Sequence, residues 1–345
     1  MGAGADTATL DVEAVGGWIA AHVPGFSGPV TAQKFPTGQS NPTFRLATPK
    51  GDLVLRRKPP GRLLKSAHAV DREYRVQEAL AETPVPVARM IAYCNDLAVI
   101  GSEFYLMEHV QGRHFNLPHL PELPPDARGP IFDEMNRVLA AIHEVDLAAT
   151  GLADYGPSGN YYRRQIDRWT TQYRASETET IPAMDALIAW LDANVPPDDG
   201  QTCLTHGDYR LDNLLFAPDA PRVAAVLDWE LSTLGHPYAD LAQVIMQWQR
   251  PPGPEGRGLA GLDRAAEGLP EDAAFIEAYC ARRGLTGIPR FGFYIAFANF
   301  RMAGILQGVK KRALDGNASN PEKGLRLGAL VPGLAEAGLE AAADA

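Results

Sequence analysis

Five residues in the middle of the chain have types and spacing that could carry out chemistry together. His206, Gly207 and Asp208 are followed after four residues by Asn213, and Asp228 comes at the end of a later apolar run. Phosphoryl transfer needs a carboxylate beside the attacking hydroxyl and two oxygen ligands that hold Mg²⁺ against the nucleotide phosphates. A loop that carries Asp208 and Asn213, facing a strand that ends in Asp228, supplies all three groups.

The sequence around these residues resembles the aminoglycoside phosphotransferase and choline kinase branch of the kinases. The order H-x-D-x4-N followed by a metal-binding aspartate is typical of kinases, and Gly207 and the DWE at 228–230 are typical of this branch. The resemblance covers roughly residues 20–325. The segments HGDYRLDN, LDWELSTLGHPYADLA, VLRRKPPG and FRMAGILQGVKKRALDGNAS are similar to the kinase-like domain that is fused to acyl-CoA dehydrogenases in some proteins.

The resemblance implies a role for each residue of the motif and implies ATP and Mg²⁺ as cofactors. Asp208 would orient or deprotonate the acceptor hydroxyl, and Arg210 would help to neutralise the transferring phosphoryl group. Asn213 and Asp228 would bind Mg²⁺. The alternative for the first part of the motif is a buried turn with no chemical role. Structural support of the site is expected from His206 and from Asp240, which would brace the loop from the following helix.

The chain is expected to form an α+β, bilobal, protein-kinase-like fold. Residues 1–110 read as a small β-rich N-terminal lobe that binds the nucleotide, and residues 111–345 as a larger, mainly helical lobe for catalysis and substrate binding. Helices are expected near 11–23, 68–81, 130–145, 160–174, 181–194, 238–249, 270–283 and 290–314. Strands are expected near 29–35, 43–48, 53–58, 88–93, 103–110, 202–205 and 223–228.

In the small lobe, Arg56 stands where the phosphate-binding lysine of kinases would stand. Arginine can grip phosphate through two donors, so the change preserves the role. Arg57 or Lys58 would take it over if the strand register shifted by one residue. Glu73, in the next helix, is the expected partner of Arg56, and its alternative is an ordinary exposed helix charge.

Two further segments of the small lobe are expected to meet the nucleotide. The turn that contains Gly38, Ser40 and Asn41 stands where a glycine-rich loop would cover the phosphates, and a plain hairpin turn explains it equally well. The run 104–112 resembles the hinge of kinases, where backbone groups of Glu108 and Val110 would meet the adenine edge.

The acceptor is predicted from a group of arginines in the large lobe. Arg164 and Arg168 lie one helical turn apart, with Arg163 beside them, and they suit an anionic acceptor. A hydroxyacyl-CoA fits, and the resemblance implies it. The alternative is a solvated basic face of a helix. An acyl-CoA dehydrogenase domain is expected to be a separate protein in the same pathway, because too few residues remain for one here.

Other functions fit the motif less well. An aminoglycoside or a choline-type amino alcohol keeps the same chemistry with a cationic acceptor. A catalytically silent, nucleotide-binding pseudokinase is an alternative of another class, and the intact Asp208, Asn213 and Asp228 argue against it. A protein kinase is disfavoured because residues 231–237 leave no room for a regulated activation loop.

Composition narrows the class of protein. The chain of 345 residues has 42 acidic and 32 basic side chains, a net charge of −10, which weighs against nucleic acid or an anionic membrane as the main partner. No apolar run approaches the ~20 residues that cross a bilayer. The 3 cysteines are widely spaced, as in proteins of a reducing compartment, so a cytoplasmic phosphotransferase is expected.

Overall fold

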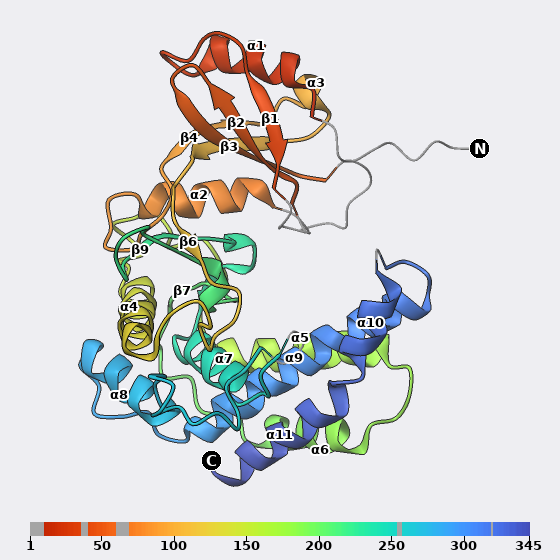
Figure 1. Cartoon of the computed structure of the whole chain (residues 1–345). Helices are drawn as coiled ribbons and strands as arrows, with labels where there is room; N and C mark the ends of the chain where they lie inside the picture. The colour runs from red at the N-terminus through yellow and green to blue at the C-terminus, as the bar shows by residue number, and fades with distance from the viewer. Residues whose placement is uncertain (1–9, 36–40, 60–68, 254–256, 319) are drawn as a thin grey trace. The chain divides into compact units, whose positions relative to one another are not determined.

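A computed structural model describes residues 10–35, 41–59, 69–253, 257–318 and 320–345 of the chain (Figure 1). The chain divides into two compact units, and each unit is assembled from separate stretches of the sequence. Unit 1 comprises Met1–His114, Ala148–Leu152 and Asn213–Ser232, and unit 2 comprises Phe115–Leu147, Ala153–Asp212 and Thr233–Ala345.

Unit 1 is built on an antiparallel five-stranded sheet with the strand order β1-β2-β3-β5-β4. Leu53 and Leu55 alternate along β3 and are buried on one face with Val15 and Ile19 of α1. Tyr105 of β5 points to the other face, where it meets α2. The elements are α1 (Val12–His22), β1 (Thr31–Lys34), β2 (Thr43–Thr48), β3 (Gly51–Arg57), α2 (Val70–Leu80), β4 (Met90–Cys94), α3 (Leu97–Ile100) and β5 (Phe104–Glu108).

A second, three-stranded sheet of unit 1 has the order β6-β8-β9, with β6 (Arg113–His114), β8 (Leu214–Phe216) and β9 (Val223–Val226). The η2 turn (Trp229–Leu231) follows β9 and contacts α2. The lobe boundary expected at residue 110 assigns residues 213–232 to the C-terminal lobe, whereas the contacts within the fold assign them to unit 1. The reason is the pairing of β6 with β8 about a hundred residues later, which strands of two or three residues do not reveal through periodicity.

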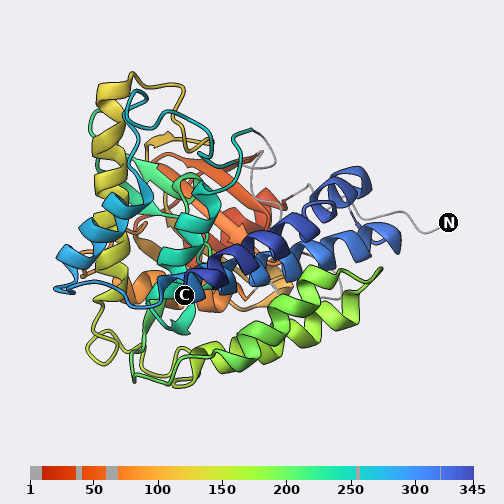
Figure 2. The ribbon, with the colours of Figure 1, turned by 90° about the horizontal axis from the view of Figure 1, so that it is seen from below.

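Unit 2 is mainly helical and is organised around α9 (Phe291–Leu314), which contacts α5, α6, α7, α10 and α11 (Figure 2). Phe293, Tyr294, Phe297 and Phe300 of α9 are buried, in agreement with the apolar helical spacing of this run. The other elements are α4 (Pro125–His143), α5 (Tyr161–Ser176), α6 (Pro182–Ala193), β7 (Cys203–Thr205), η1 (Leu211–Asn213), β10 (Thr233–Gly235), α7 (Tyr238–Trp248), α8 (Asp272–Arg282), α10 (Pro321–Gly328) and α11 (Val331–Ala343).

The helices expected from periodicity all occur, with bounds that differ mostly by one to three residues. Helix α4 is the exception, since it starts at Pro125 inside a segment that reads as a surface connection. Proline is well suited to the first turn of a helix, where its missing N–H costs no hydrogen bond. Among the described residues, six short elements and two C-terminal helices were not expected; they are α3, β6, η1, β8, η2, β10, α10 and α11.

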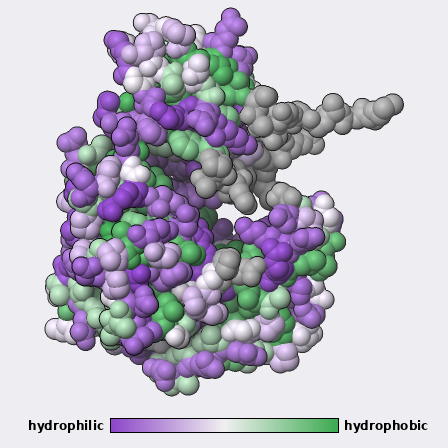
Figure 3. Space-filling model, viewed as in Figure 1, coloured by the Kyte–Doolittle hydropathy of each residue, from purple (hydrophilic) through white to green (hydrophobic). Residues whose placement is uncertain are grey.

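The surface of the described residues is dominated by polar side chains. In the view of Figure 3, hydrophilic residues cover much of the visible face, with apolar ones scattered among them. The exposed large apolar side chains are Leu97, Leu231, Leu314 and Leu325, which come from separate elements. Among the described residues, every helix is too short or too polar to cross a bilayer.

Candidate active site

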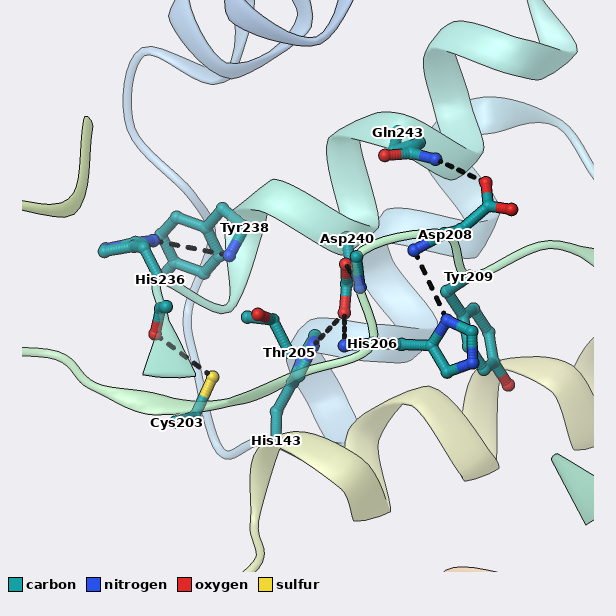
Figure 4. Close-up of polar contacts among 12 residues, drawn as sticks. His143, Cys203, Thr205, His206, Asp208, Tyr209, His236, Tyr238, Asp240 and Gln243 are labelled. Carbon is teal, nitrogen blue, oxygen red and sulfur yellow. Dashed lines mark hydrogen bonds and ion pairs between the residues drawn. The ribbon is translucent and has the colours of Figure 1, made fainter. Parts of the chain in front are cut away.

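The loop 206–208 of unit 2 is held by one buried carboxylate from the helix that follows it. Asp240, in the first turn of α7, accepts the backbone N–H of His206 at 2.6 Å on Oδ2 and that of Gly207 at 2.9 Å on Oδ1 (Figure 4). Gly207 has φ +81°, a conformation that a side chain would strain. Asp240 therefore braces the loop, as expected, through these two hydrogen bonds.

A histidine and a tyrosine complete the surroundings of this carboxylate. Nε2 of His143 lies 3.4 Å from Oδ2 of Asp240, and Nδ1 of His143 lies 2.7 Å from the Tyr279 hydroxyl. Burial lowers the pKa of His143, so the ring is neutral near pH 7. A neutral ring that donates from Nε2 to Asp240 accepts the Tyr279 hydroxyl on Nδ1. Burial alone raises the pKa of Asp240, but His143 and the backbone N–H groups bring it below its usual value.

The carboxylate of Asp208 is oriented by two donors and remains within reach of solvent. Nε2 of Gln243 donates to Oδ1 at 3.1 Å, and Nε of Arg210 donates to Oδ2 at 3.1 Å. The Asp208 side chain is 25% exposed, which leaves room for an acceptor to approach it. Burial raises the pKa of Asp208, and the positive charge of Arg210 opposes this rise. A carboxylate of raised pKa is a better proton acceptor than an ordinary aspartate.

Arg210 is shared between two aspartates. Besides Asp208, Arg210 pairs with Asp212, with 3.2 Å between its Nη1 and Oδ2 of Asp212. Arg257 also pairs with Asp212, at 2.6 Å. Arg257 additionally donates to the backbone oxygen of Asn116. Neither Asp212 nor Arg257 was predicted from the sequence. Asp212 directly precedes Asn213 in the motif, which is a signal, whereas Arg257 lies in a glycine- and proline-rich loop without periodicity.

In unit 1, Arg56 lies at the centre of a cluster of carboxylates. Its Nε is 2.7 Å from Oε2 of Glu73, and its Nη2 is 2.8 Å from Oδ1 of Asp228 and 3.7 Å from Oε2 of Glu230. Burial alone lowers the pKa of Arg56, but Glu73 and the other acids raise it above its usual value. The arginine is therefore charged, and it joins β3, α2 and the turn after β9.

The contacts of Glu73 exclude its reading as an exposed helix charge. Glu73 is 1% exposed, and its second oxygen accepts from Nδ2 of Asn41 at 2.6 Å. The register of β3 points Arg56 toward Glu73. Arg57 instead lies over the ring of Phe44, and Lys58, just beyond the strand, pairs with Glu103 and Asp71.

Asn213 and Asp228 lie next to each other through the pairing of β8 with β9. The backbone N–H of Leu227 donates to the Asn213 carbonyl at 2.8 Å, which brings the following Asp228 beside Asn213. Asp228 has φ +63°, and its side chain is 35% exposed. One carboxylate and one amide fit Mg²⁺, which takes oxygen ligands and keeps several waters and substrate phosphates in its shell.

The other residues expected to contact the nucleotide lie in different environments. Gly38 and Ser40 lie outside the described residues. The side chain of Asn41 is buried and bonded to Glu73, so its amide is used within the fold. Glu108 ends β5, and its N–H donates to the Arg89 carbonyl, so the backbone group of Glu108 suited to a ligand is its carbonyl.

The three arginines proposed for the acceptor occupy the first half of α5 in unit 2. Arg163 pairs with two aspartates of unit 2, at positions 167 and 192. Arg164 donates to the backbone oxygens of Pro157 and Ser158, so it braces the segment before the helix. Arg168 is exposed, and its guanidinium lies 5.7 Å from the centre of the Trp169 ring.

Comparison with known proteins assigns the chain to a family. The model of the Phosphotransferase enzyme family matches residues 31–293. The chain is 47% identical over 295 residues to acyl-CoA dehydrogenase family member 10 of Mus musculus, which is 85% of this chain and 28% of that protein. The chain spans less than half the length of the curated relatives that it matches.

Solved structures agree with this assignment. A protein of Ralstonia eutropha that bears the provisional name of an aminoglycoside phosphotransferase is 51% identical, with a TM-score of 0.90 over 97% of this chain and 99% of that chain. An aminoglycoside phosphotransferase solved with AMP-PNP and hygromycin B shares the fold, with a TM-score of 0.62 at 17% identity over 95% and 98% of the two chains. The chain belongs to the phosphotransferase enzyme family, and the expected α+β kinase-like fold is confirmed.

The bracing contact of Asp240 predicts the effect of an isosteric change. Asp240→Asn replaces one acceptor oxygen by an NH2 group, which faces a backbone N–H that it cannot accept. We expect the free energy of unfolding at pH 7 to fall by about 1–3 kcal/mol. Urea unfolding followed by circular dichroism measures it. Asp263→Asn is the matched control, since Asp263 accepts the N–H of Ala266 at an exposed position.

The sign of the pH dependence follows from the lowered pKa of Asp240. The unfolded chain binds the proton more readily, so the stabilisation is complete above the unfolded pKa of about 3.9 and is lost as the pH falls through the folded pKa. The contribution of Asp240 to the difference in free energy of unfolding between wild type and Asp240→Asn is therefore constant from pH 5 to 8. It becomes smaller at more acidic pH. A difference that widens on acidification would contradict an ionised Asp240.

Proposed function

We propose that the chain transfers the γ-phosphoryl group of Mg·ATP to the hydroxyl group of a small molecule. The observation that carries this proposal is the state of Asp208, whose carboxylate is oriented by Gln243 and Arg210, is partly exposed and has a raised pKa. Membership of the phosphotransferase family supports the same reaction class.

In the proposed reaction, Asp208 accepts a hydrogen bond from the acceptor hydroxyl and takes up its proton. A bond forms between the acceptor oxygen and the γ-phosphorus while the bond to the β-phosphate oxygen breaks, and ADP leaves. Arg210 is held beside Asp208 and Asp212, and it would balance charge on the transferring group. Mg²⁺, when bound, neutralises phosphate charge, and Asn213 and Asp228 would hold it.

The nucleotide is proposed to bind through residues of unit 1. Arg56 would contact the phosphates, with Glu73 holding its guanidinium in place. The carbonyl of Glu108 and the N–H of Val110 would meet the adenine edge. Gly38, Ser40 and Asn41 remain proposed as the turn that covers the phosphates. An aminoglycoside phosphotransferase of the same fold holds AMP-PNP, which supports ATP as the donor.

The acceptor is proposed to be a hydroxyacyl-CoA, and a separate acyl-CoA dehydrogenase would be a partner in its metabolism. The support is the similarity to proteins named for acyl-CoA dehydrogenases and the exposed positive charge of Arg168 on α5. Arg163 and Arg164 would assist from the same helix. An aminoglycoside or a choline-type amino alcohol is the second candidate, since neighbours of this fold include an enzyme with hygromycin B bound.

Replacing the proposed base tests the reaction directly. Asp208→Asn removes the proton acceptor at nearly constant size, so we expect kcat to fall about 10²–10⁴-fold while the affinity for Mg·ATP changes little. Coupled-enzyme detection of ADP gives kcat, and calorimetric titration gives the affinity. Asp126→Asn, at an exposed site in the first turn of α4, should leave both quantities unchanged. Undiminished turnover of Asp208→Asn would remove Asp208 from the reaction.

Replacing the proposed metal ligand should act on binding. Asp228→Ala should weaken the affinity for Mg·ATP by about 10-fold or more, because the loss of a group beside a metal has at least this effect. The measurement is titration with ATP at fixed Mg²⁺ and again with EDTA. The control is Asp219→Ala, an exposed aspartate in the connection between β8 and β9. An unchanged affinity in Asp228→Ala excludes Asp228 from the metal site.

The acceptor class is tested by Mg²⁺-dependent ADP release with parallel panels of hydroxyacyl-CoAs, aminoglycosides and amino alcohols. Stimulation by hydroxyacyl-CoAs is expected, and Arg168→Ala should raise their KM about 10-fold, the effect of losing about 1.4 kcal/mol of binding. The control Arg222→Ala changes another exposed arginine. Stimulation by cationic acceptors alone would overturn the hydroxyacyl-CoA proposal. Binding of Mg·ATP without turnover of any panel would favour a silent pseudokinase.

A further inference from the structure

A glutamine of α7 connects Asp208 to an arginine of α9 within unit 2. Gln243 is 7% exposed, and its Nε2 donates to Oδ1 of Asp208 at 3.1 Å (Figure 4). Its Oε1 accepts a hydrogen bond from Nη1 of Arg301 at 2.6 Å. The two ends of one buried amide therefore face a carboxylate on one side and a guanidinium on the other.

Arg301 reaches the same loop a second time. Its Nη2 donates to the backbone oxygen of Gly207 at 2.8 Å, next to Asp208 in the chain. Its guanidinium also lies 5.9 Å from the centre of the Trp169 ring, on α5. The planar guanidinium is thus held by contacts to two helices and to the loop, so its donors have fixed directions.

The chemistry of arginine decides which way the amide of Gln243 points. A guanidinium has only donors, so the amide atom that faces Arg301 must be the oxygen. The NH2 group then faces Asp208, where it stabilises the ionised carboxylate. In the opposite orientation the amide oxygen would face a carboxylate and the amide NH2 would face a guanidinium, and both contacts would be repulsive.

We propose that Gln243 and Arg301 are positioning residues that fix the direction of the Asp208 carboxylate toward the acceptor hydroxyl. This inference rests on the proposed phosphoryl transfer. Gln243 and Arg210 then have different tasks, because Arg210 would also serve the transferring phosphoryl group and Gln243 would not. Arg301 keeps the amide in the donating orientation, and Gln243 keeps Oδ1 in place.

An isosteric change separates the donor role of Gln243 from its packing. Gln243→Glu preserves the size and the contact with Arg301, but it replaces the NH2 group by an oxygen that cannot donate to Asp208. We expect kcat to fall about 10²-fold, the cost of a catalytic group displaced by about 1 Å, with the KM for ATP unchanged. The melting temperature should fall only slightly, since pairing of the new carboxylate with Arg301 offsets part of its repulsion from Asp208.

The control for this change is Gln247→Glu, one turn further along α7, where the side chain is partly buried. It should leave kcat unchanged. Arg301→Met frees the amide to turn and should lower kcat to a similar extent, whereas Arg301→Lys, which keeps a donor, should retain more activity. The double variant Gln243→Glu/Arg301→Met should lose less than the sum of the two single effects.

Crystal structures of wild type, Gln243→Glu and Arg301→Met give a readout that does not depend on turnover. The expected result is a rotated Asp208 carboxylate in both variants. If the wild type is active and both variants keep its kcat and its Asp208 conformation, the positioning role is overturned. A wild type that is inactive with every acceptor removes the proposed function instead, and the Asp208 conformation in the variants then decides the positioning role by itself.

Discussion

The acceptance of two backbone N–H groups by the buried carboxylate of Asp240 is the contact on which the loop 206–208 depends. A turn that leaves β7 with positive φ at Gly207 cannot satisfy these N–H groups within a helix or a sheet. An ionised acceptor is the strongest partner for two such donors, and its burial is tolerated because His143 donates to it as well. The loop and the start of α7 are therefore one rigid piece.

Around this rigid piece, charged and polar groups alternate so that each side chain limits the freedom of the next. Asp208 is held by Gln243 and Arg210, and Gln243 is in turn held by Arg301. Such a network restricts rotamers without filling the space in front of the carboxylate, which stays 25% exposed. Orientation and access are the two properties that a general base needs together.

In unit 1, charged side chains also restrict one another, here around a buried arginine. Arg56 is a buried cation with acids on either side, and it links a strand, a helix and the turn that carries Asp228. A buried arginine without Glu73 would carry an uncompensated charge, so the ion pair and the position of α2 depend on each other. Asp228 is the most exposed acid of this cluster, which suits the exchange of partners that the proposed binding of nucleotide and metal requires.

Local sequence was sufficient for the long helices, for most strands of the first sheet and for the motif from His206 to Asp228, because periodicity and motif spacing are local properties. The pairing of Arg56 with Glu73 was expected from the resemblance to kinases, whereas the strand register that selects Arg56 over Arg57 and Lys58 was set by the pairing of β3 with its neighbours. Tertiary structure alone decided that Gln243, Arg301 and Arg257 join the site. Their hydrogen bonds connect residues 35 to 94 positions apart, or lie in a loop without periodicity, and no local pattern records such partners. It likewise decided that β6 pairs with β8, because a strand of two residues is defined only by its neighbour.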